Sequence, residues 1–407
     1  MPTHSAIDVP ASGPNAVGLI LTGGGARAAY QVGVLSAVMD ILDPHRTGHM
    51  PNPFPIICGT SAGAINAAAL ACRAHDPHTA ADRLVHLWSD LRTGDVYHGD
   101  ALRLIRTGIR WLSLLSLGWM APGLRERSPR SLLDNSPLRG LLSEALDFDR
   151  LAVNLNAGDL TALAVTASTY TTGEHLTFYQ SRKQIQPWRR ALRHAEPTLI
   201  GVDHLLASSA IPFVFPAQAL RVRNGVHWCG DGSMRQLAPI SPAIHLGAQK
   251  IFVIGTGFRD ETHPEEGELA SDYPSLAQIG GHALTNIFLD SVSMDIERVD
   301  RVNELLAQTS RNGLKLESLR PISTFAVTPS QSLDVIAIRH LSQLPKATRA
   351  LFRVLGVSAA KGSQRGGALI SYLLFEAAYT RELIDLGRAD CLSRTEEVKS
   401  FFKEARE

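Results

Sequence analysis

The sequence predicts an α/β fold, a mostly parallel central sheet flanked by helices, with a helical C-terminal extension. Two observations predict the sheet. Short, continuous apolar runs are typical of parallel strands buried on both faces, and such runs occur at 16–22, 54–58 and 251–254. These runs alternate with stretches of helical periodicity, which is the pattern of a parallel α/β sheet. The extension is predicted because helical patterns dominate after residue 258.

Taken in order, the chain divides into a Pro/Ser/Gly-rich leader at 1–14, a region at 15–258 that carries every chemical motif, and a mainly helical region at 259–407 that packs on the core. Apolar residues at helical spacing, or small residues after a turn, predict helices. The expected helices are one through Val32, Leu35 and Met39, and others at 62–72, 79–92, 202–209, 292–306, 344–357 and 368–387. Further strands are expected at 160–169, 177–179 and 226–229, with one more near 322–328.

Composition excludes several classes of protein. The 407 residues are 44% hydrophobic and 19% charged, with a net charge of +1, so nothing indicates a nucleic-acid partner. The four cysteines are widely spaced, which argues against a disulfide framework or a zinc site. The first fifteen residues lack a secretory pattern, and no apolar run reaches 18 residues. We expect a cytoplasmic protein with at most peripheral membrane contact, and no metal or cofactor.

One segment, 102–120, has the pattern of a basic amphipathic helix. Arg103, Arg106 and Arg110 share one side of the helix, and apolar residues cover much of the rest. Such a helix can lie on an anionic lipid surface, or it can cap the core with solvated arginines. Both interpretations stay open. The tail after Arg394 is expected to be a charged helix with a solvated face.

A nucleophile turn is the first chemical motif. Gly59-x-Ser61-x-Gly63 lies between a predicted strand and a predicted helix, which is the context in which G-x-S-x-G positions a reactive serine. The sharp turn pushes the central side chain outwards, and small neighbours are needed where the backbone crowds. The start of the following helix favours negative charge, which stabilises an alkoxide or oxyanion.

A glycine turn, 23–25, follows the first strand and has two possible uses. Exposed amides at a helix start bind an oxyanion or a phosphate. The same stretch up to Ala28 also fits the dinucleotide pattern G-x-G-x-x-G/A, with Asp40 and Asp43 near the spacing of a ribose ligand. A nucleotide-binding protein is therefore an alternative, although it leaves Ser61 unexplained.

An aspartate turn is the third motif. Asp231 stands between Gly230 and Gly232 at the end of a predicted strand, where we expect an exposed carboxylate. A serine nucleophile needs a base, and a conventional Ser-His-Asp esterase of soluble esters would use a histidine such as His227 or His245. An aspartate that only caps a turn is the plainest alternative.

Three motifs in this order resemble those of the patatin-like phospholipases, lipid acyl hydrolases with a Ser-Asp dyad and a three-layer α/β/α fold. The segment 208–216 before the aspartate is similar as well, and the likeness covers about residues 16–257. It implies that Ser61 is the nucleophile and Asp231 the base, and that the substrate is a phospholipid or lysophospholipid. The oxyanion hole that it implies is formed by Gly23, Gly24, Gly25 and Arg27.

Two residues depart from the family's pattern. Ser233 stands where a second glycine usually follows the aspartate, and it would be unfavourable if its φ had to be positive. Ala28 replaces another common glycine. A scaffold without activity is therefore a further alternative. An aspartate base has an ordinary pKa well below the operating pH, so we expect the oxyanion hole to supply much of the rate enhancement.

Overall fold

The computed structural model describes residues 16–48, 50–99, 131–223, 225–258, 278–282, 285, 290–311, 319–354, 356–357 and 367–403. The predicted leader, 1–14, and the predicted amphipathic segment, 102–120, lie outside the described residues. In the described part of the chain, no helix combines the length and the apolar character needed to cross a membrane.

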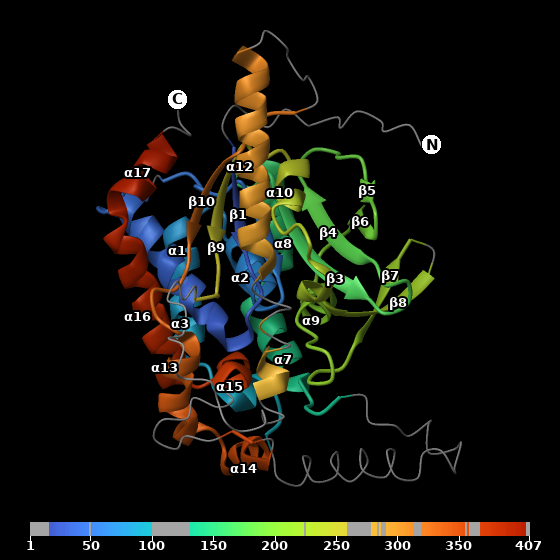
Figure 1. The fold of residues 1–407 in the computed structure, drawn as a ribbon, viewed down its shortest axis with the longest axis vertical. Coiled ribbons are helices and arrows are strands. Elements are labelled where there is room, and N and C mark those ends of the chain that lie inside the picture. Colours follow the sequence, from blue (N-terminus) through green and yellow to red (C-terminus); the bar gives the residue numbers. More distant parts are fainter. Residues whose placement is uncertain are drawn as a thin grey trace, which may run out of the picture.

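The described strands form one sheet of ten strands in the order β10-β9-β1-β2-β3-β4-β6-β5, with β8 on β3 and β7 on β8 (Figure 1). The strands are β1 Val17–Leu21, β2 Ile56–Thr60, β3 Ala162–Thr169, β4 His175–Ser181, β5 Arg189–Arg190, β6 Arg193–Pro197, β7 Gln218–Val222, β8 Gly225–Asp231, β9 Lys250–Ile254 and β10 Ser323–Val327. The five strands from β10 to β3 are parallel, whereas β4, β8, β7 and β5 pair antiparallel with a neighbour. The predicted mostly parallel α/β sheet is confirmed.

Helices cover both faces of this sheet and continue to the end of the described chain. They are α1 Ala29–Leu42, α2 Ala62–Ala71, α3 Pro77–Asp90, α4 Thr93–Val96, α7 Ser136–Ala145, α8 Phe148–Ala157, α9 Val202–Ser208, α10 Ser241–His245, α12 Asp290–Arg311, α13 Leu333–His340, α14 Lys346–Val354, α15 Gly367–Leu373, α16 Ala377–Ser393 and α17 Thr395–Lys403. Three short 3-10 helices are η1 Gly25–Ala28, η2 Gly232–Arg235 and η3 Leu341–Gln343.

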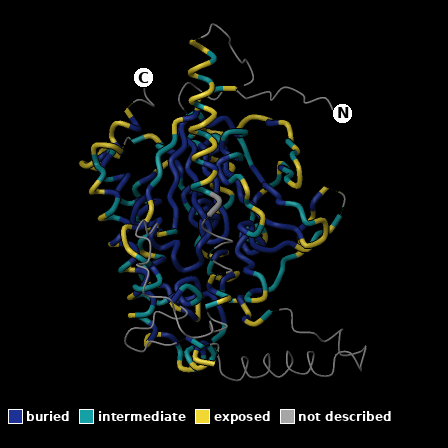
Figure 2. The backbone as a smooth tube through the Cα atoms, viewed as in Figure 1, coloured by how far each residue is buried: buried dark blue, intermediate teal, exposed yellow. Residues whose placement is uncertain are grey.

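Two hydrophobic cores lie on opposite faces of the sheet. The larger core joins alternate residues of the central strands, such as Leu19 and Ile57, to α1, α2, α3 and α16. The smaller core joins the intervening residues, such as Ile20 and Cys58, to α10 and to one side of α12. Figure 2 shows the central strands buried and the far end of α12 exposed. This alternation explains the continuous apolar runs in the sequence, because both faces of these strands are covered.

The C-terminal region is part of the same body as the sheet. Its strand β10, at 323–327, extends the sheet beside β9, and α16 lies along α1 (Figure 1). The single helix predicted over 368–387 is two helices, because the chain is extended at Glu376, which bridges to Arg92.

The predicted charged tail helix is present as α17 with its charged side exposed, but it also has a buried apolar side that the prediction missed. Phe401 and Phe402 of α17 are buried and pack on Phe252, at ring-centroid distances of 5.8 Å. Charge pairs dominate the tail sequence, and they conceal this apolar face.

Candidate active site

One edge of β3 pairs with two strands in succession, first with β2 and then with β8. Its first half pairs with β2, ending with Thr60 beside Thr166. Its second half pairs with β8, and Ala167, the next residue, lies beside Asp231. Ser61 follows Thr60 directly, so the end of β2 and the end of β8 meet at one place. This arrangement brings together two residues that are 170 positions apart.

Ser61 occupies a strained turn between β2 and α2. Its φ of 55° and ψ of −129° lie outside the conformations that serine prefers. Gly63 is required here, since a Cβ on it would lie 2.4 Å from the carbonyl oxygen of Leu21. The Ser61 amide donates to Ser208 Oγ at 2.8 Å, which fixes the turn against α9. Gly59 and Gly63 thus have the steric role that the sequence predicts.

Ser61 and Asp231 form a direct, buried hydrogen bond. Ser61 Oγ donates to Asp231 Oδ2 at 2.6 Å, and the Ser233 amide donates to Oδ1 at 2.9 Å. The prediction of an exposed carboxylate is wrong, because Asp231 has 0% of its surface exposed and Ser61 has 1%. Gly230 and Gly232 are needed here for close packing and not for exposure of the carboxylate. The strand β8 ends between β3 and α9, where the Asp231 amide donates to the Ala210 carbonyl at 3.0 Å.

Burial also changes the acid strength of this carboxyl. Desolvation raises the pKa of Asp231 to about 6, against the opposing effect of the hydrogen bonds from Ser61 and Ser233. The expectation of an ordinary aspartate pKa is therefore wrong. A base with a pKa near 6 takes up a proton more readily than an ordinary aspartate and is still ionised at neutral pH.

The departure from the family's pattern at Ser233 does not strain the backbone. Ser233 lies in η2, directly after Gly232, and its φ is not positive. Its amide supplies one of the hydrogen bonds that hold Asp231. The residue that replaces the usual glycine therefore keeps the geometry of the turn.

The glycine turn lies beside Ser61. Thr256 Oγ1 donates to the Gly23 carbonyl at 2.7 Å, and the Arg27 amide donates to the Gly24 carbonyl at 3.1 Å. Gly25 has a φ of +54°, and a Cβ there would lie 2.2 Å from the carbonyl oxygen of Tyr372 in α15. Gly25, Ser61 and Ala62 line one pocket, so the turn and the start of α2 face the same space.

The Arg27 side chain points away from this pocket, toward the C-terminal region. Its guanidinium forms an ion pair with Asp334, and its Nε donates to Ser371 Oγ at 2.8 Å. It also lies over the Tyr372 ring, 4.0 Å from the centroid. Arg27 thus ties the back of the glycine turn to α13 and α15. No pattern in the sequence indicated these partners.

A buried amide network, which the sequence analysis missed, holds both ends of the glycine turn. Gln31 Nε2 donates to the Thr22 carbonyl at 2.8 Å, and Asn66 Nδ2 donates to the Ala28 carbonyl at 3.1 Å. Trp88 Nε1 in turn donates to Asn66 Oδ1 at 2.8 Å. The sequence does contain a signal for this network: the side-chain amides of Gln31 and Asn66 lie within otherwise apolar helices. Buried polar side chains need hydrogen-bond partners, so two such amides indicate a buried network.

The pocket beside Ser61 is apolar over most of its wall. It continues from the serine between α2, α3 and α7. Its apolar lining residues are Ala62, Ile65, Leu87, Trp88, Leu91, Val96, Leu138, Leu141, Leu142, Ile211, Phe215 and Phe375. An apolar pocket that begins at a reactive serine suits a hydrocarbon chain.

The alternative predictions for other residues do not fit the geometry. In the described part of the chain, His227 and His245 make no hydrogen bond with Ser61 or Asp231, and His245 stacks on Trp188 at 4.7 Å beneath the other face of the sheet. No imidazole stands between Ser61 and Asp231, as a conventional triad requires.

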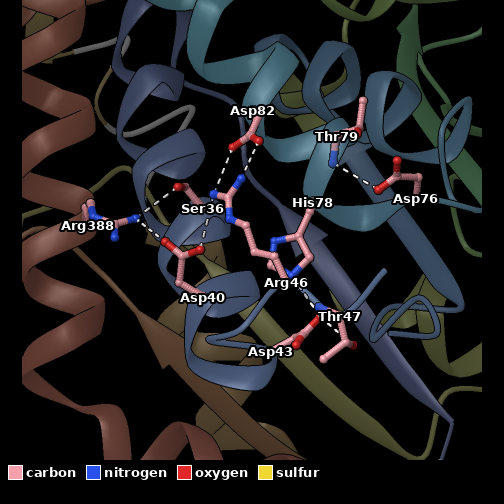
Figure 3. Close-up of polar contacts among 10 residues, drawn as sticks. All are labelled: Ser36, Asp40, Asp43, Arg46, Thr47, Asp76, His78, Thr79, Asp82 and Arg388. Atoms are coloured by element: carbon pink, nitrogen blue, oxygen red, sulfur yellow. Dashed lines mark hydrogen bonds and ion pairs between the residues drawn. The ribbon is translucent and has the colours of Figure 1, made fainter. Parts of the chain in front are cut away.

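The two aspartates of the nucleotide alternative lie at the far end of α1 from the glycine turn. Figure 3 shows that Asp40 pairs with Arg46 and Arg388, and that Asp43 accepts hydrogen bonds from Thr47. A 14-residue helix separates them from the turn, a length of about 20 Å. They are engaged in a surface network and do not face the glycine turn.

A serine at a strained strand-to-helix turn, hydrogen-bonded to a buried carboxylate on an α/β sheet, defines a site of the serine hydrolase class. The sequence profile described as Patatin-like phospholipase matches residues 19–244, which is more than half of the chain. The chain belongs to this family, and its general activity is that of a lipid acyl hydrolase. The resemblance found in the sequence is thereby confirmed.

Comparison with solved structures gives VipD from Legionella pneumophila, at 14% sequence identity and a TM-score of 0.32. That match covers 92% of this chain and 67% of VipD. Comparison with curated protein sequences gives no match.

Proposed function

We propose that this protein hydrolyses fatty-acyl esters of phospholipids or lysophospholipids through an acyl-enzyme, with Ser61 as nucleophile and Asp231 as base. The observation that carries the proposal is the 2.6 Å hydrogen bond from Ser61 Oγ to Asp231 Oδ2. It supports transfer of the hydroxyl proton directly to the carboxylate, without a histidine between them.

The reaction has two steps. Ser61 Oγ attacks the ester carbonyl carbon as Asp231 takes its proton, and the tetrahedral intermediate collapses when that proton passes to the departing lysolipid or glycerol oxygen. Water then attacks the acyl-enzyme, with Asp231 as the proton acceptor again, and releases the fatty acid. The raised pKa of Asp231, caused by burial, suits both directions of proton transfer.

The oxyanion of the intermediate needs hydrogen-bond donors. We assign this role to the amides of Gly24 and Gly25, together with the Ala62 amide at the start of α2, where the helix dipole adds favourable charge. Gly23 and Arg27 hold these amides in position and do not contact the oxyanion themselves. The Gly23 carbonyl accepts a hydrogen bond from Thr256, and Arg27 forms an ion pair with Asp334. Loss of one such donor typically costs about 2.7–4 kcal/mol of transition-state stabilisation.

The substrate class follows from the pocket. A fatty-acyl chain fills the apolar space between α2, α3 and α7, which leaves its ester at Ser61 and its head group outside the apolar lining. Desolvating a long chain supplies binding free energy of about 0.8 kcal/mol for each buried methylene. Short soluble esters forgo most of this energy, which favours lipids over the soluble esters of a conventional esterase.

Labelling with a fluorophosphonate probe tests the nucleophile. The wild type should label, and Ser61→Ala should not. Ser143→Ala, which changes an exposed serine on α7, is the matched control and should label fully. Failure of the wild type to label, or continued labelling of Ser61→Ala, would remove Ser61 from this role.

Release of fatty acid from a phospholipid tests the base. Asp231→Asn should lower kcat by about 10²–10⁴-fold, the usual contribution of a general base. Asp149→Asn, at an aspartate near the start of α8, should retain full activity. Equal activity of Asp231→Asn and the wild type would contradict the dyad.

A further inference from the structure

A row of polar and basic residues crosses the sheet on the face opposite Asp231. Ser168 of β3 lies beside His175 of β4, His175 lies beside Arg193 of β6, and Arg193 lies beside Arg190 of β5. Residues paired across neighbouring strands point to the same face of a sheet. Four strands therefore bring these side chains together, on the side covered by α10.

Two side-chain atoms in this row are buried and have no hydrogen-bond partner in the described part of the chain, although the His175 imidazole as a whole is hydrogen-bonded to the Gly232 backbone. They are Ser168 Oγ and His175 Nε2, whose residues are 5% and 4% exposed. Buried polar atoms in native proteins nearly always have a partner, so a pair without one indicates a missing ligand or water. His175 lines a pocket that opens toward Arg190 and Arg193.

The charge around this pocket is positive and is not balanced by an ion pair. Within the described residues, Arg193 makes no salt bridge or hydrogen bond, and Arg190 hydrogen-bonds only the Arg189 carbonyl, at 3.0 Å. Burial and, to a smaller extent, the charge of Arg193 lower the pKa of His175 to about 4, against the opposing effect of a backbone hydrogen bond with Gly232. Arg190 and Arg193 likewise add to the effect of burial in lowering the pKa of His245, which lies on α10.

The acidic groups nearby make their hydrogen bonds elsewhere, although the charge of Arg193 does act on the Asp295 carboxyl and opposes the rise that burial causes in its pKa. Asp295 accepts the Ile240 amide at 3.0 Å, and Glu174 pairs with Arg189 at 3.2 Å. Glu196 accepts the Arg223 amide at 3.0 Å. None of these carboxylates lies within 4 Å of either free arginine in the described structure. A small anion is thus the ligand that the arginines and the buried imidazole can accommodate.

We propose that this pocket, with His175 at its floor and Arg190 and Arg193 at its rim, binds a phosphate group. Two guanidinium groups match the oxygens of a phosphate, and its protonated oxygen can donate to His175 Nε2. The group is either free phosphate or the phosphate of a lipid head group. The site lies behind the dyad, and its occupancy does not depend on the proposed role of Ser61.

Binding of inorganic phosphate tests the site. Calorimetric titration of the full chain, with sodium chloride at equal ionic strength as the reference, should give saturable binding to the wild type and to Ser61→Ala. Arg193→Gln should bind phosphate at least about tenfold more weakly, the loss expected for one charge-assisted hydrogen bond. Arg221→Gln, at an exposed arginine on β7, is the matched control and should bind like the wild type.

Folding of each variant is checked by its thermal transition without phosphate, and Arg190→Gln gives a second position at which weaker binding is expected. Absence of saturable binding by the wild type, or equal affinity in Arg193→Gln, would overturn the proposal. Sedimentation with phosphatidic acid vesicles identifies the source of the phosphate group. Sedimentation that depends on Arg193 indicates a lipid head group, and sedimentation that does not depend on it indicates free phosphate.

Discussion

The side-chain amides of Gln31 and Asn66 are hydrogen-bonded to each other, with Asn66 Nδ2 donating to Gln31 Oε1 at 3.1 Å, and both residues are fully buried. Gln31 also holds the residue before the glycine turn, and Asn66 holds the residue after Arg27. This pair therefore fixes the spacing between the two ends of the turn, and with it the direction of the amides that we assign to the oxyanion hole.

The first prediction concerns this pair. Asn66→Ala leaves the Trp88 indole and the side-chain oxygen of Gln31 without a partner, and each unsatisfied buried group costs about 1–3 kcal/mol. We expect urea unfolding to show a loss of about 2–4 kcal/mol, and kcat to fall more than KM rises. Gln343→Ala, at an exposed glutamine, should change neither. Normal kcat in a folded Asn66→Ala would show that the turn does not need the pair.

The second prediction concerns the pH dependence of activity. Because burial raises the pKa of Asp231 to about 6, the carboxylate is ionised above that pH and protonated below it. The rate, as kcat/KM, should rise about tenfold per pH unit below pH 6 and level off above it. A profile that is flat down to pH 4 would mean that Asp231 keeps an ordinary pKa or is not the base.

The third prediction concerns stability. The pKa of Asp231 is 3.8 in an ordinary setting and about 6 in the folded protein, so the folded state binds the proton more tightly between these values. Stability then falls as pH rises from about 4 to 6 and stays lower above 6. Asp231→Asn removes this cost and should be up to about 3 kcal/mol more stable than wild type at pH 8. At pH 3.5 the two should be equal, and chemical unfolding at both pH values measures the difference.

The fourth prediction concerns the strained turn. Ser61 has a φ of 55°, which glycine tolerates and alanine does not. Ser61→Gly and Ser61→Ala both remove the hydroxyl, so their difference isolates the backbone strain. We expect Ser61→Gly to be about 1 kcal/mol more stable than Ser61→Ala. Greater stability of the alanine variant in thermal unfolding would show that the turn relaxes without a serine.

The fifth prediction concerns the length of the acyl chain. Leu142 of α7 is buried and lines the apolar pocket, so a larger side chain there shortens the space for the substrate. Leu142→Phe should lower kcat/KM for a hexadecanoyl ester about tenfold relative to an octanoyl ester. Leu146→Phe, at a buried leucine that does not line the pocket, should leave this ratio unchanged. An unchanged ratio in Leu142→Phe would place the acyl chain elsewhere.

Local patterns were sufficient to predict much of the fold. The central strands are covered on both faces, so their sequences are continuous apolar runs. The strands predicted at 160–169 and 177–179 are present as β3 and β4, and the helix after Ser61 begins at the predicted residue. The region after residue 258 was harder to predict, because its strand β10 joins the sheet and its helix α16 packs on α1. The charged faces of its helices also dominate its sequence.

The residue types and spacing of the motifs were sufficient to locate the three turns in the sequence. The contacts that require their glycines are with distant residues, such as Leu21 for Gly63 and Tyr372 for Gly25. The tertiary structure alone decided how those turns are used. The pKa of the Asp231 carboxyl is raised because β3 pairs with β2 and β8 in succession, which buries this carboxyl against Ser61. Arg27 meets Asp334 over a separation of 307 residues. Burial and long-range pairing depend on the whole sheet, and no local pattern encodes them.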